Sequence, residues 1–152
     1  MADKPGIKFN IANIARIILI IAGVMIIGLS VFFFFKVRTE SKAALREAKN
    51  IRMALRMADI EFYAQEKCVF NPNNYDGLEA GAKEKVEQIV QPQGTYRITS
   101  YSTRYHEITG MTYRVGNYNV IFTKEGESIR WDVTYLMQVY HFDEEDTKIV
   151  KK

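Results

Sequence analysis

The chain is 152 residues long, which is about the length of one domain, and its formal net charge is only +3. The charges are unevenly distributed: residues 1–56 hold ten Lys or Arg and three Asp or Glu, whereas residues 57–152 hold eleven and fifteen. An acidic second part argues against a nucleic-acid-binding surface there, because phosphate groups bind to positive surfaces. The single cysteine, Cys68, excludes a disulfide bond within this sequence. We interpret it as a small buried apolar residue rather than a reactive thiol.

An uncharged stretch of 19 residues, IILIIAGVMIIGLSVFFFF at 17–35, follows an N-terminal flank at 1–16. As a helix it would extend over roughly 28 Å, which matches the hydrocarbon core of a bilayer. A cleavable signal peptide normally has a shorter apolar region that ends in a small-x-small cleavage site. A helix buried in a soluble core is the other alternative. We predict a transmembrane anchor that crosses the membrane once.

Basic residues directly follow the predicted span and form what we call the basic collar: Lys36, Arg38 and Lys42. They could contact lipid headgroups electrostatically, although a solvated helix face explains them equally well. Taken literally, the positive-inside rule favours a cytoplasmic second part, but the rule is strongest for short loops and a domain follows here. Charge alone therefore leaves the orientation open.

A second periodic pattern continues through residues 36–67 without Gly or Pro, so we predict that one helix runs on from the span to about residue 65. Its apolar residues recur at spacings of four and three, as in a helix that buries one face. The predicted packing stripe consists of Ala44, Ala48, Ile51, Leu55, Ala58 and Phe62. The residues expected to widen it are Met53, Met57, Ile60 and Ala64. The charged residues expected to face solvent are Arg46, Lys49, Arg52, Arg56 and Asp59.

The remaining residues, 68–142, have the composition of a small α+β head. The segment NPNNYDG at 71–77 is rich in turn-forming residues, and a short amphipathic helix is predicted at about 78–90. From about residue 95 to 140, β-branched and aromatic residues alternate with polar ones, which indicates strands with one buried face. Glycines in ITGM, VGNY and KEGES predict tight turns between antiparallel strands.

The fold class predicted from these elements is α+β: a long transmembrane and amphipathic helix packed against a small antiparallel sheet. A sheet with one apolar face needs a partner, and the packing stripe of the helix is the obvious candidate. The last ten residues, DEEDTKIVKK at 143–152, are predicted to be a flexible tail.

This layout resembles that of type IV pilins and pseudopilins over nearly the whole chain. The N-terminal sequence MADKPGIKFNIANIARI offers a short basic leader with Lys4, a possible leader end at Gly6, and Phe9. These families carry Glu at the fifth mature position, whereas the fifth residue counted from Ile7 is Ile11. The resemblance implies a pilin-like fold, an outward-facing head on the cytoplasmic membrane, and helix packing with other pilin-like or secretion-apparatus subunits.

Catalytic groups, cofactor sites and metal sites are not predicted. The two histidines, His106 and His141, fall in predicted strands without Cys or carboxylates at metal-ligand spacing. The sequence also lacks a glycine-rich phosphate loop and a nucleophile elbow. Asp59, Glu61 and Glu66 are interpreted as part of a solvated helix face.

Two functional hypotheses follow, and neither is an enzyme. The first is a membrane-anchored, pilin-like structural subunit, a minor component of a type IV pilus or a type II secretion-like assembly, whose partners are the lipid bilayer and similar subunits. The second is a membrane-anchored binding or sensor domain that does not polymerise and receives an unknown ligand. Nucleic acid is not expected as a partner of either.

Overall fold

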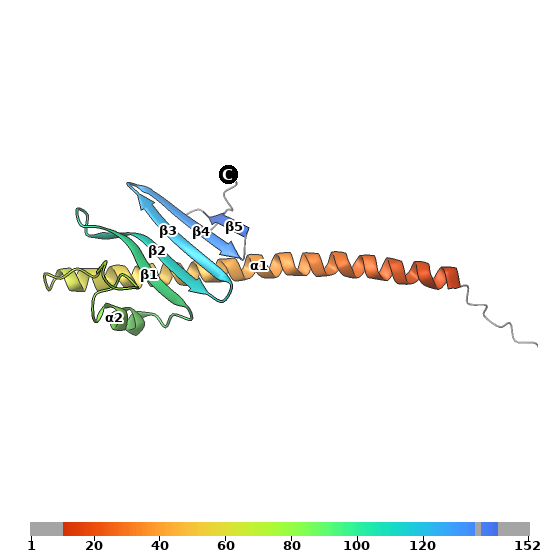
Figure 1. Cartoon of the computed structure of the whole chain (residues 1–152), viewed down its shortest axis with the longest axis horizontal. Helices are drawn as coiled ribbons and strands as arrows, with labels where there is room; N and C mark the ends of the chain where they lie inside the picture. The colour runs from red at the N-terminus through yellow and green to blue at the C-terminus, as the bar shows by residue number, and fades with distance from the viewer. Residues whose placement is uncertain (1–10, 136–137, 143–152) are drawn as a thin grey trace, which may run out of the picture. The chain divides into compact units, whose positions relative to one another are not determined.

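The computed structural model describes residues 11–135 and 138–142 of the chain (Figure 1). The chain divides into two units, residues 1–38 and residues 39–152, and helix α1 (Ile11–Tyr63) contributes to both. The predicted tail at 143–152, the possible leader end at Gly6 and most of the N-terminal flank lie outside the described residues.

The first unit is described as the N-terminal part of α1. Its large apolar side chains, from Ile14 to Phe35, are exposed in the isolated chain. Ser30 satisfies its hydroxyl within the helix by donating a hydrogen bond to the Ile26 carbonyl oxygen at 2.8 Å. Among the described residues, α1 is the one helix with the length and apolar composition to cross a membrane.

The second unit contains an antiparallel sheet of five strands in the order β1-β2-β3-β4-β5. The strands are β1 (Thr95–Ser102), β2 (Glu107–Val115), β3 (Tyr118–Glu125), β4 (Ser128–Tyr135) and β5 (Gln138–Phe142). Each strand pairs with the next one in the chain, so the sheet is a simple meander. A short helix, α2 (Ala82–Ile89), precedes the sheet. The predicted α+β layout of a long apolar N-terminal helix and an antiparallel sheet is confirmed.

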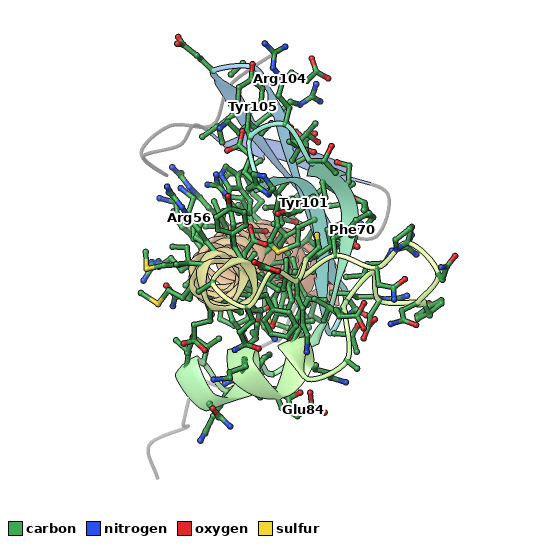
Figure 2. All side chains as sticks on the ribbon, turned by 90° about the vertical axis from the view of Figure 1, so that its left-hand side faces the viewer. Arg56, Phe70, Glu84, Tyr101, Arg104 and Tyr105 are labelled. Carbon is green, nitrogen blue, oxygen red and sulfur yellow. The ribbon has the colours of Figure 1, made fainter. Side chains whose placement is uncertain are left out.

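The core of the second unit lies between α1 and one face of the sheet. All six residues of the packing stripe are buried, and the sheet contributes a second set of buried side chains: Met111, Tyr113, Val120, Phe122, Trp131 and Val133. The Arg52 guanidinium lies 4.0 Å from the centroid of the Phe122 ring. Tyr118 donates a hydrogen bond to Glu40 at 2.8 Å. The view along α1 shows the sheet on one side of the helix and α2 beneath it (Figure 2).

The open edge of β1 is covered by the turn-rich segment before α2. The backbone N–H of Ile98 donates to the Asp76 carbonyl oxygen at 2.8 Å. Gly77, at φ 70°, lies so close that a Cβ there would overlap the Ile98 carbonyl group. This segment therefore blocks part of a strand edge that could otherwise pair with another chain.

Three sequence predictions about the head need correction. The glycine of ITGM, Gly110, lies inside β2 rather than in a turn, because the first hairpin turns at residues 103–106. His106 is in that turn, at φ 47°, and not in a strand. The short helix begins at Ala82 and not near residue 78, since the preceding residues form turns. The turns at Gly116 and Gly126 are as predicted, and His141 lies in β5.

Methionine provides a matched test of this core. Met111 is fully buried in β2, whereas Met57 of α1 is exposed. We expect Met111→Ala to lower the free energy of unfolding of the detergent-solubilised chain by about 2–5 kcal/mol, because it leaves a cavity. Met57→Ala deletes a methionine side chain that is exposed to solvent, and it is expected to lower the free energy of unfolding by less than about 1 kcal/mol. Urea unfolding monitored by circular dichroism measures both, and equal losses would contradict the described burial.

Candidate functional site

The strongest candidate for a functional surface is the face of α1 that the sheet does not cover. Met53, Met57 and Ile60 are 61%, 48% and 63% exposed, and we call these three residues the exposed ridge. The prediction that these three residues and Ala64 widen the buried stripe is wrong, because Ala64 is also exposed and follows the end of α1. The stripe is widened by Leu45 and Ala54 instead, which are both buried.

The geometry of an α-helix explains the error. Each residue turns the helix by about 100°, so Met53 and Met57, each two residues from Leu55, lie roughly 160° around the axis from it. The sheet covers the side of Leu55 and leaves the methionine side uncovered. Both sets of residues show spacings of three and four. A helical wheel shows that the two sets lie on different faces of α1, but only the position of the sheet decides which face is buried.

Cations border the exposed ridge. Arg46 and Arg56 are exposed, and Figure 2 shows Arg56 projecting from α1 on the side away from α2. Lys49 and Arg52 are half-buried, so the prediction that both face solvent is wrong. Their cationic groups lie 5.8 and 6.0 Å from the centroid of the Trp131 ring, where a cation is attracted to the aromatic face.

The basic collar is distributed over both units. Lys36 and Arg38 belong to the first unit and are exposed, whereas Lys42 belongs to the second unit and is half-buried. Two of the three collar residues are therefore exposed directly after the apolar segment of α1. Contact with lipid headgroups would require exposed cations at this position.

Asp59 forms a buried polar contact that the sequence did not indicate. Its side chain is only 5% exposed, so the predicted solvated position is wrong. The Tyr101 hydroxyl lies 3.0 and 3.2 Å from the two carboxylate oxygens and donates to them. Burial raises the pKa of Asp59 above its ordinary value, while hydrogen bonds from Tyr101 and the Val69 backbone oppose that rise.

Aromatic stacking surrounds this contact. Phe70 stacks on Tyr101 with ring centroids 5.8 Å apart, and both are labelled in Figure 2. The His106 ring lies 4.6 Å from that of Tyr63 at the end of α1. These contacts join the end of α1 to β1 and to the turn after β1. We interpret the hydrogen bonds between Asp59 and Tyr101 as a structural contact that holds α1 against β1.

Within the described residues, no group of three or more His, Cys, Asp or Glu is placed to hold a metal ion. Cys68 is exposed, which corrects its interpretation as a buried residue, and its sulfur accepts a hydrogen bond from the Phe70 backbone at 3.4 Å. It lies in the segment after α1 rather than in the core.

A shallow groove lies between the first and third hairpin turns of the sheet and has a volume of about 400 Å³. Its lining includes Ser102, Tyr105, Thr109 and an ion pair between Lys124 and Glu107 at 2.5 Å. The charges of Lys124 and Glu107 neutralise each other, so the groove offers hydroxyl groups, one aromatic ring and the further carboxylate of Glu127.

Comparison with known proteins gave no match for the chain. No protein-family model matches it, and no curated protein or solved structure is significantly similar to it. The function must therefore be argued from the surfaces just described.

The pKa of Asp59 gives a pH-dependent prediction. Because the folded carboxyl has a pKa above its ordinary value of 3.8, the folded chain holds this proton at pH values where the unfolded chain has lost it. Stability from this group is therefore present below the unfolded pKa and is lost as pH rises through the folded pKa. Asp59→Asn stays neutral, so its free energy of unfolding relative to that of the unsubstituted chain should rise with pH across this window.

Urea unfolding at a series of pH values measures this difference. The matched control is Glu125→Gln, which neutralises an exposed carboxylate at the β3–β4 turn. The free energy of unfolding of this control should change with pH in the same way as that of the unsubstituted chain. If the difference between Asp59→Asn and the unsubstituted chain does not change with pH, burial does not perturb the Asp59 carboxyl.

Proposed function

We propose that the chain is a single-pass, membrane-anchored structural subunit of the pilin-like kind. In this proposal it is a minor component of a type IV pilus or a type II secretion-like assembly, with its head outside the cytoplasmic membrane. The apolar part of α1 is the anchor, and lateral packing of helices holds neighbouring subunits together.

The observation that carries this proposal is the two-sided apolar character of α1 in the second unit. One side is buried under the sheet, and the exposed ridge is on the other. A helix that only supported the sheet would have a polar outer face. Methionine and isoleucine at spacings of four and three supply instead the apolar line that a neighbouring helix could contact.

The alternative is a membrane-anchored binding domain that does not polymerise. The groove of about 400 Å³ lined by Ser102, Tyr105 and Thr109 favours it, since ligand sites are concave and carry a few polar groups. This hypothesis assigns no role to the exposed ridge, so a test of the ridge separates the two.

Cysteine cross-linking in membranes tests the ridge. In a Cys68→Ser background, Met53→Cys and Met57→Cys are expected to give disulfide-linked dimers on mild oxidation, because a neighbouring copy would place the same face nearby. The matched control is Lys83→Cys, an exposed position on α2 rather than on α1. Dimers at all three positions would indicate random collision. Their absence at Met53 and Met57 would contradict lateral packing through this face.

The anchor and its processing have a separate test. The chain is expected to remain in the membrane pellet after alkaline carbonate extraction, because about 19 apolar residues suffice to span a bilayer. If the pilin-like resemblance extends to processing, mass spectrometry should find a chain that begins after Gly6 in cells with a prepilin peptidase. Replacing Gly6 should then abolish that cleavage. An intact N-terminus in such cells would favour the non-polymerising alternative.

A further inference from the structure

The groove between the first and third hairpin turns is formed by the ends of three strands and by the turns that join them. Ser102 ends β1, and Tyr105 lies in the turn that follows. Glu107 begins β2, and Lys124 lies near the end of β3. The volume of about 400 Å³ falls within the range of small-molecule sites, roughly 300–1,000 Å³. The groove is therefore large enough to hold a small ligand.

Tyr105 supplies an exposed aromatic wall to this groove. The residue is 67% exposed, and Figure 2 shows it together with Arg104 on the side of the sheet away from α2. The Arg104 guanidinium lies over the Tyr105 ring, 5.4 Å from its centroid, where a cation is attracted to the aromatic face. An aromatic ring has two faces, so a ligand can contact the face that the guanidinium does not cover.

Two hydroxyl groups also line the groove. The Ser102 hydroxyl has no hydrogen-bond partner among the residues that the structure describes. Thr109 donates a hydrogen bond to the Ser100 hydroxyl oxygen at 2.9 Å, which leaves the lone pairs of the Thr109 oxygen as acceptors. The groove thus offers a ligand one hydroxyl that can donate and accept, and a second that can accept.

The charged groups at the groove are balanced in sign. Lys124 and Glu107 are half-buried and form an ion pair at 2.5 Å. Glu127 adds a carboxylate from the third turn, and Arg104 adds a cation at the tyrosine ring. Two positive and two negative groups leave no net charge, so the groove favours a neutral ligand over an anion or a cation.

The lining also disfavours a wholly apolar ligand. Among the described residues it includes no Val, Leu, Ile or Met side chain, whereas small-molecule sites for apolar ligands are lined mainly by such residues. One exposed ring among hydroxyl, carboxylate and ammonium groups suits a neutral molecule with one apolar face and many polar groups at its edge. A pyranose ring has this chemistry, because its C–H groups form an apolar face and its hydroxyls both donate and accept hydrogen bonds.

We propose that this groove is a binding site for a neutral saccharide. A pyranose ring stacks on Tyr105, and its hydroxyls form hydrogen bonds with Ser102 and Thr109. The Glu127 carboxylate accepts a further, charge-assisted hydrogen bond from the sugar. Saccharide binding here gives a ligand class to the binding hypothesis. It does not depend on the pilin-like proposal, because the groove lies in the sheet and the exposed ridge lies on α1.

Nuclear magnetic resonance titration of the full ¹⁵N-labelled chain tests the site. The chain is held in dodecylphosphocholine micelles, since this detergent has no sugar headgroup that could compete. The probes are maltotriose, cellotriose, lactose and triacetylchitotriose at millimolar concentrations. We expect at least one probe to shift the amide signals of Ser102, Tyr105 and Glu127 in a saturable way, while the signals of α2 stay unchanged.

Two tyrosine variants provide a matched comparison. Tyr105→Ala should weaken binding of that probe by about three- to tenfold, because the sugar loses its aromatic contact. Tyr75→Ala should leave the affinity unchanged. Tyr75 is 91% exposed and has the Arg97 guanidinium 5.8 Å from its ring centroid, but it lies in the segment before α2. Since both tyrosines are exposed, neither variant should unfold the chain, and urea midpoints check this.

Three results would overturn the inference. The first is the absence of saturable shifts at the groove with all four probes. The second is an affinity that does not respond to Tyr105→Ala, or that falls equally with Tyr75→Ala. The third is binding of cationic glucosamine or anionic glucuronate about tenfold tighter than that of neutral N-acetylglucosamine, because the charges of the groove would then not be balanced. None of these results bears on lateral packing through the exposed ridge, which is measured separately in membranes.

Discussion

The second unit depends on one shared burial, in which the packing stripe of α1 and the inner face of the sheet cover each other. A five-stranded meander has a single layer, so its apolar face is stable only against another element. The stripe is rich in alanine, and the sheet contributes large buried side chains such as those of Trp131 and Phe122. Small residues on one layer and large residues on the other allow two layers to pack at the density of protein interiors. Everything else in the head is attached to this pair of layers.

The same arrangement determines which partners the charged side chains of α1 contact. Because the sheet and α2 occupy different flanks of α1, each flank meets different partners. Glu61 meets a lysine of α2, while Arg52 lies over the aromatic rings of β3 and β4. Both arrangements let long charged side chains pack their stems against the core while their charged ends stay near partners or water. The cations of α1 are therefore part of the packing as well as of the surface, which composition alone does not reveal.

The helices and strands could be predicted because their sequence signals are local. Which face of α1 is buried could not be predicted in this way. The absence of Gly and Pro predicts a helix, and alternation around Val120 and Trp131 predicts strands. Assigning Met57 to the core failed because its spacing fits a buried stripe as well as an exposed one, and only the position of the sheet separates them. The prediction that Asp59 is solvated was also wrong. A carboxylate on a helix is normally solvated, and the partner of Asp59, Tyr101, lies 42 residues further along the chain. Gly110 was assigned to a turn because a glycine within a strand has the same local signature.

The exposed ridge requires an explanation, whereas single exposed apolar residues do not. Single apolar side chains on a surface are common and require no explanation. Met53, Met57 and Ile60 instead form one line on a helix whose opposite side is already buried, so they do not contribute to the core of the head. A helix needs only one apolar face to support a sheet, and the other positions are then expected to be polar. The second apolar line is unexplained by the fold of a single chain, whereas contact with another helix would explain both its residues and its spacing.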